Sequence, residues 1–231
     1  MKEECQENCT MEISNHIFSH NPILWLSTKY FSIKSIKKVS QCILSDLPYY
    51  KKNKSQLTEG LTIGDELGPV KFSFPLDIIS CHANIGCNEF ASEVVKEVSS
   101  DVSLVDVPPT ALTRKRVFLL YLNEHTFRDE GGEVQLMIRR ASEMSVPIVL
   151  VHEQTEGKGA HPFYLFFGQT PQDLINPSIM IYKSIATPLY YIDEYRKVSL
   201  RQIMSEMGAT SAKKIQILVP DAICYKGNDR H

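Results

Sequence analysis

Two spacings of apolar residues alternate along the chain from Phe72 onward. Short, almost continuous apolar runs indicate buried strands, and apolar residues three or four positions apart indicate amphipathic helices. The strand-like runs occupy 74–80, 101–107, 117–123, 146–153 and 185–190, and the helical stretches occupy 88–100, 130–145 and 198–209. Strands that are apolar on both faces and alternate with helices predict an α/β fold. Its core is an open, flavodoxin-like parallel sheet with helices on both faces.

Capping and turn residues predict where the helices begin and end. Asn88 is a typical N-cap for the first helix and Ser199 for the last, while Gly208 is a typical helix stop. The segment 155–171 shows no clear period, so we expect an irregular loop. Its apolar side chains are expected to lie in the core: Phe163, Leu165, Phe166 and Phe167.

The N-terminal part of the chain predicts an αβ extension. An apolar, aromatic segment is followed by a helix that Ser35 would cap, and a short strand is expected near Leu61 to Ile63. One helix and a short apolar segment cannot form an independent core, so we expect this part to pack against the sheet domain. The predicted division of the chain is a tail (1–20), the extension (21–71), the sheet domain (72–219) and a polar tail (220–231).

Composition excludes several classes of protein. The chain has 231 residues, 43% of them hydrophobic, and a net charge of −2. These values fit a globular domain and argue against a dedicated nucleic-acid binder, which would carry a basic surplus. Two lysine runs are interpreted as solvated faces: Lys34, Lys37 and Lys38, and Lys51, Lys52 and Lys54.

The same sequence points to a cytoplasmic protein without a membrane partner. No apolar run approaches the ~18 to 20 residues of a membrane-spanning helix. The acidic, polar N-terminus does not resemble a signal peptide. The six scattered cysteines are then expected to be free thiols, because disulfides are rare inside cells.

Polar residues cluster where three of the predicted strands end. In an open parallel sheet, ligands bind outside the carboxyl ends of the strands, where helix N-termini and loops meet. The candidate ligand-binding residues at these ends are Cys81, His82, Asn84, Asn123, His125, His152 and Glu153.

Several interpretations of this cluster remain open. These residues could serve only as caps and loop hydrogen-bonding groups, or at least one of them could contact a ligand. His82, His125 and His152 could converge on a zinc ion, and Cys81 could pair with a histidine as a reactive thiol. Neither arrangement has a standard local spacing, and no phosphate-binding glycine motif is present.

The segment 75–209 resembles a divergent Toll/interleukin-receptor (TIR) domain. The resemblance lies in the order of the elements and in three stretches, FPLDIISCHANIGCNEFASEVVKEV, DVSLVDVPPTALTRKR and RKRVFLLYLNEHTFRDEGGEVQLMIRRASEMSVPIVLVHE. The last is the best match, because Val146-Pro147-Ile148-Val149 resembles the iPii strand of the family.

The resemblance implies two different activities. Some TIR domains are assembly modules that associate with one another, and others cleave the N-glycosidic bond of NAD⁺ with a glutamate on a helix before the iPii strand. Glu133 matches the position of that glutamate, and a carboxylate there could stabilise an oxocarbenium-like transition state. The residues before it, Arg128 to Gly132, depart from the usual Ser or Cys and Trp. Glu133 could equally be an acid that complements the helix dipole.

We therefore expect an intracellular signalling or assembly module of TIR-like type. It would act through protein partners or self-association and would require no cofactor. The alternative is an NAD⁺ glycohydrolase with Glu133 as its catalytic residue and NAD⁺ as substrate. A weaker alternative is a metal- or thiol-dependent hydrolase at the same edge of the sheet.

Overall fold

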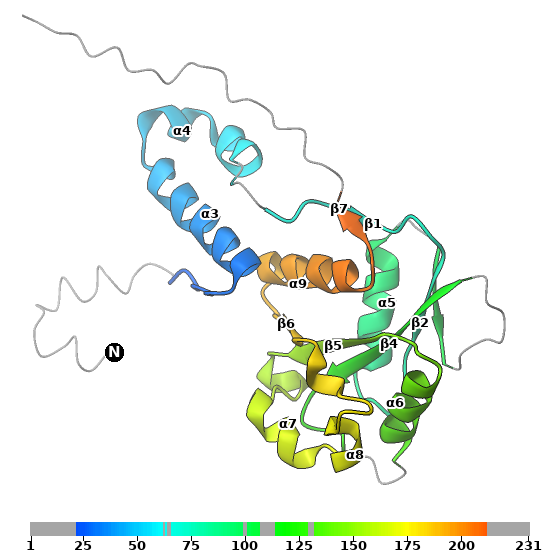
Figure 1. Ribbon diagram of the computed structural model, residues 1–231. Coiled ribbons are helices and arrows are strands. Elements are labelled where there is room, and N and C mark those ends of the chain that lie inside the picture. The colour runs from blue at the N-terminus through cyan, green and yellow to red at the C-terminus, as the bar shows by residue number, and fades with distance from the viewer. Residues whose placement is uncertain are drawn as a thin grey trace, which may run out of the picture.

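The computed structural model describes residues 22–61, 63, 66–98, 101–106, 114–128 and 132–211. The predicted tails and the apolar run in 214–219 lie outside these residues. In the described part of the chain, strands and helices alternate after residue 72 as the apolar spacing predicts (Figure 1).

The centre of the molecule is a five-stranded parallel sheet with the order β3-β2-β4-β5-β6. Its strands are β2 (Leu76–Ile79), β3 (Val102–Val105), β4 (Lys115–Leu122), β5 (Ile148–Glu153) and β6 (Thr187–Leu189). A second, two-stranded antiparallel sheet joins β1 (Val70–Lys71) to β7 (Thr210–Ser211). The predicted α/β class with an open parallel sheet is confirmed.

Helices cover both faces of the sheet because alternate strand residues point in opposite directions. On one face Val117, Leu119 and Tyr121 pack in a core that includes buried residues of α5 (Cys87–Glu97) and α9 (Asp193–Glu206). On the other face Phe118, Leu120 and Leu122 pack in a core with α6, α7 and α8. These three helices span Glu133–Glu143, Phe163–Gln169 and Gln172–Ile175. Two short 3₁₀ helices, Glu156–Lys158 (η2) and Ile181–Lys183 (η3), complete the loops on either side of α7 and α8.

The N-terminal extension forms an arm that leaves the sheet domain beside α9 (Figure 1). It consists of α3 (Lys29–Ser45), α4 (Pro48–Lys52) and a π-helical turn, η1 (Gln56–Gly60). At the base of the arm, Phe31 of α3 packs with Tyr195 and Val198 of α9. The Tyr195 hydroxyl donates to the Leu24 carbonyl at 2.5 Å and lies 3.1 Å from the Ser35 hydroxyl.

Several predicted element ends are wrong, and the causes are tertiary. Ser35 lies inside α3 and Ser199 lies inside α9; both are fully buried and bond helix carbonyls instead of capping. Helix α5 begins at Cys87 after Gly86, and Asn88 accepts a hydrogen bond from the Ser80 hydroxyl at 2.6 Å. Gly208 follows the end of α9, as predicted.

Two segments differ in type from the prediction. Leu61 and Ile63 belong to no strand, since the chain there follows η1. The aromatic part of 155–171 is the helix α7, whose Phe166 is fully buried. The helical form places Phe163 and Phe166 on one side, where both contact His152 of β5. The four apolar residues expected in the core therefore separate, with Leu165 and Phe167 exposed and Phe163 half-buried.

Candidate functional site

The strand order places a topological switch point between β2 and β4. From β2 the chain crosses to β3 on one side, and the later strands extend the sheet on the other side. A crevice is expected outside the carboxyl ends of the two strands at such a point. The loops after β2 and β4 carry five of the predicted site residues, so the carboxyl edge is the candidate functional site.

Asn84 and Asn123 are buried at this edge, and the backbone uses their amide groups. Asn84 accepts a hydrogen bond from the Tyr121 N–H at 2.9 Å and donates to the Tyr121 carbonyl at 2.8 Å. Asn123 donates to the Ile85 carbonyl at 2.7 Å and accepts from the His125 N–H at 2.9 Å. Both residues hold the loops after β2 and β4 together.

His82 and Glu133 meet at the entrance to this edge. The His82 Nε2 atom lies 3.8 Å from the Glu133 carboxylate, and the two side chains are 72% and 56% exposed. Glu133 is the first residue of α6, directly after Gly132 at the N-cap, so its carboxylate also lies at the positive end of the helix dipole. The pair links the loop after β2 to the start of α6, two segments that carry the TIR resemblance. Both side chains are exposed to solvent.

The other strand-end residues divide between the surface and the core. His125 is exposed, with its Nε2 atom 3.5 Å from the Glu124 carboxylate. Cys81 is buried in the second core, the one between the sheet and helices α6, α7 and α8. The neighbouring Cys87 is fully buried as well, and burial raises the pKa of its thiol to about 12, so it stays protonated at neutral pH.

His152 points to the face of the sheet that α7 covers, where Cys81 also lies. Its Nε2 atom lies 2.7 Å from the His161 carbonyl and its Nδ1 atom lies 2.9 Å from the Gln154 amide nitrogen. Burial lowers the pKa of His152, which favours the neutral ring with a proton on Nε2. Since both nitrogens have protein partners, this histidine is poorly placed to bind a metal.

Glu153, by contrast, points toward α9 and is fully buried. Its carboxylate accepts a hydrogen bond from the Tyr121 hydroxyl and another from the Thr155 N–H, the second at 2.7 Å. Burial, and then the bond to Glu153, raise the pKa of Tyr121. Tyr121 is the single hydroxyl-bearing side chain in the run VFLLYL, and this was the only sequence signal for its role.

A pocket of about 250 Å³ opens beside this buried pair, at the switch point. Arg196 of α9 crosses it to Glu93 of α5, donating from Nε to the Glu93 carboxylate at 2.6 Å. This ion pair raises the pKa of Arg196. Residues from α5, β4, η2, α9 and two loops line the pocket: Ile85, Gly86, Glu89, Phe90, Glu93, Tyr121, Asn123, Lys158 and Arg196. Of the predicted site residues, only Asn123 is among them.

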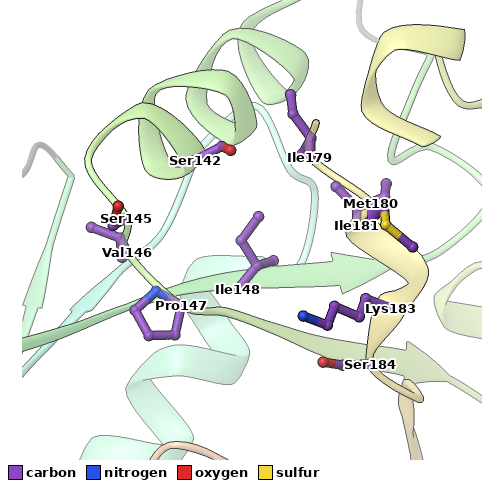
Figure 2. A pocket seen from close by; sticks show the side chains of 10 residues that line it. All are labelled: Ser142, Ser145, Val146, Pro147, Ile148, Ile179, Met180, Ile181, Lys183 and Ser184. Carbon is purple, nitrogen blue, oxygen red and sulfur yellow. The ribbon is translucent and has the colours of Figure 1, made fainter. Parts of the chain in front are cut away.

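A larger depression of about 280 Å³ lies at the opposite, amino end of β5. Figure 2 shows Ser142 and Ser145 from the end of α6 on one side and Lys183 and Ser184 on the other, with Ile148 between them. None of the predicted site residues lines it, so it is separate from the carboxyl edge.

The predicted site residues thus form several small groups rather than one constellation. His82, His125 and His152 belong to three separate hydrogen-bonded or ionic groups. Within the residues that the structure describes, no group of three or more His, Cys, Asp or Glu side chains is arranged to hold a metal ion.

Comparisons with known proteins leave the family open. No protein-family model matches the chain, and no curated protein sequence matches it. In the described part of the chain, no helix is both long and apolar enough to cross a bilayer.

Proposed function

We propose that this chain is a TIR-like assembly module that associates with a second copy of itself. The order of strands and helices supports a TIR-like core, because the resemblance over 75–209 covers the elements from β2 to α9. The observation that carries the proposal is the solvent-facing side of α7.

Helix α7 has the sequence FYLFFGQ and no charged residue. Phe166 points into the core, while Tyr164, Leu165 and Phe167 are 71%, 36% and 49% exposed. A helix on the surface of a monomer normally presents a polar face to water. We name these three exposed residues the α7 surface.

Ring contacts with Tyr182 fix the position of α7 and its exposed residues. Phe167 packs on Tyr182 with ring centroids 4.9 Å apart, and Phe163 packs on Tyr182 at 5.6 Å. Aromatic residues are enriched in protein interfaces, where they supply rigid contact area at low entropic cost. Because the α7 surface is small, it would form the centre of an interface whose rim comes from neighbouring loops.

The test is sedimentation equilibrium of the purified protein over a range of concentrations. We expect concentration-dependent self-association, and we expect Tyr164→Asp to weaken it at least about 30-fold, as for a typical interface hot spot. A charge at this position would have to be desolvated in the interface.

Tyr191→Asp is the matched control, because Tyr191 is 67% exposed and lies outside α7. It should leave the association unchanged. A wild-type protein that stays monomeric at all concentrations, or equal effects of the two substitutions, would refute this proposal.

The His82–Glu133 pair favours a second candidate, the cleavage of NAD⁺. The two side chains approach within 3.8 Å from the loop after β2 and the start of α6. In that role Glu133 would contact the ribose and stabilise the oxocarbenium-like transition state. Asn84 and Asn123 would act only by fixing the loops, since their amides already bond backbone groups.

Incubation of the protein with NAD⁺ and measurement of released nicotinamide tests this candidate. Glu133→Ala should abolish the release, and Glu143→Ala, at the other end of α6, should not. No release by the wild type, or equal release by the Glu133 variant, rules the activity out.

A further inference from the structure

The distal part of the arm contains many exposed residues and little core. In residues 36–60, Leu57 is the only buried side chain. The packing contacts with α9 lie at the base, around Phe31, and Lys38 adds an ion pair to Glu194. The end of α3 and all of α4 extend away from the sheet domain (Figure 1). The base therefore anchors the arm, and the side chains at its far end are exposed among the described residues.

The far end combines exposed apolar side chains with positive charge that no described residue pairs. Ile43, Leu47 and Tyr49 are 66%, 46% and 58% exposed. Beside them stand three exposed lysines that form no ion pair with any described residue: Lys51, Lys52 and Lys54. We name these six residues the arm tip.

Two lysines nearer the base of the arm form ion pairs. Lys37 pairs with Glu66 at 2.8 Å, and Lys38 pairs with Glu194 at 3.1 Å. Their charges are compensated within the protein, whereas no described residue compensates those of the arm tip.

The arm carries a net positive charge, whereas the chain as a whole carries a net negative charge. Residues 22–61 contain seven lysines, no arginine, and only Asp46 and Glu59 as acids, while the net charge of the whole chain is −2. A partner of the arm tip should therefore be anionic and should accept apolar side chains at the same time.

We propose that the arm tip binds the surface of an anionic lipid bilayer. Anionic headgroups attract clustered lysines, and the headgroup boundary accommodates leucine, isoleucine and the amphipathic tyrosine ring. A protein partner would need a complementary surface of roughly 800 Å², but the arm tip consists of six side chains in and around the five-residue helix α4. A bilayer requires charge and a few insertable side chains, which the arm tip has. This inference does not rest on the proposed self-association, and it revises both the expectation of no membrane partner and the interpretation of these lysines as a solvated face.

The test is co-sedimentation of the full chain with vesicles of phosphatidylcholine alone and of phosphatidylcholine mixed with phosphatidylserine. Binding is expected only to the mixed vesicles, and it should weaken as salt increases. Since each lysine near an anionic surface strengthens binding about fivefold, the triple variant K51Q/K52Q/K54Q should bind roughly 100-fold more weakly. The double variant Leu47→Ser/Tyr49→Ser should also bind more weakly, with its charge unchanged.

The matched control is K71Q/K96Q/K197Q, which removes the same charge from exposed lysines outside the arm. It should bind the mixed vesicles as the wild type does. Absence of binding to the mixed vesicles, or equal weakening by both triple variants, would overturn the proposal. It would also fall if K51Q/K52Q/K54Q reduced self-association in the absence of lipid and left vesicle binding intact, because the arm would then bind the acidic surface of a second copy.

Discussion

Asn84 and Asn123 illustrate, at the scale of single residues, how the backbone can occupy a polar side chain. Both follow buried strands at the edge where ligands bind, and on sequence grounds both were candidate ligand contacts. In the fold their amides bond backbone groups: Asn84 those of the buried Tyr121, and Asn123 those of Ile85 and His125. Position along the chain therefore identified the carboxyl edge of the sheet. It did not identify which polar side chains at that edge already bond the backbone.

Replacing Asn84 tests this role. Asn84→Ala removes two buried hydrogen bonds and leaves the Tyr121 N–H without its acceptor, while the Tyr121 carbonyl keeps the bond from the Thr126 hydroxyl. The free energy of unfolding should therefore fall by about 2–4 kcal/mol. Urea unfolding measures the change. The exposed Asn176 serves as a control, since Asn176→Ala should stay within about 0.5 kcal/mol of the wild type.

His152 makes a second prediction at this scale, on pH dependence. Its pKa is lowered by burial, so the folded state binds a proton less readily than the unfolded chain. The stability that this histidine supports is complete above its ordinary pKa of 6.5 and declines as pH falls below that value.

Urea unfolding of the wild type and of His152→Gln, at about pH 8 and about pH 5, measures this contribution. The glutamine stays neutral and keeps an N–H donor, so the variant should lose less stability between the two pH values. An equal loss in both proteins would show that His152 contributes nothing to the pH dependence.

At the scale of elements, the packing of neighbours decided where helices begin and what form loops take. The apolar spacing correctly predicted the α5 helix, but not its start at Cys87 after an N-cap glycine, Gly86, which has a φ of +84°. The backbone there passes so close to β4 that a Cβ atom would lie 2.9 Å from the Tyr121 ring. Likewise, the aromatic run of α7 is too short to show a helical period, and Phe166 forms part of a helix because the second core accepts it there.

Two glycine substitutions should therefore have opposite effects. Gly86→Ala combines a left-handed backbone with a clash against Tyr121 and should lower the free energy of unfolding by about 2–4 kcal/mol. Gly168→Ala, in the last turn of α7 with open space around it, should raise it by about 0.5–1 kcal/mol. Thermal and urea unfolding of both variants would check the signs, and equal signs would contradict this account.

At the scale of the whole molecule, a sheet domain carries a basic arm that is attached at one helix. The attachment is specific, because Phe31, Ser35 and Tyr195 form a buried group between α3 and α9. No local pattern indicates this pairing, because Ser35 and Tyr195 are 160 residues apart in the sequence.

Tyr195→Phe should loosen the arm and leave the sheet intact. Loss of the hydroxyl removes the bond to the Leu24 carbonyl, at a cost of about 1–2 kcal/mol. Hydrogen exchange should then become roughly 5- to 30-fold faster in α3 and stay unchanged in β4 and β5. The exposed Tyr191→Phe is the control, and equal acceleration across arm and sheet would show that the two unfold as one unit.

The sequence by itself determined the α/β class, the succession of strands and helices, and the edge of the sheet where polar residues gather. These features depend on the local spacing of apolar residues, which any well-packed core of this type requires. The tertiary structure alone decided which polar groups are occupied, that α7 presents an aromatic face, and that the arm tip lies open beyond α9. Each of these depends on which distant segment lies beside a side chain, and local spacing carries no information about that.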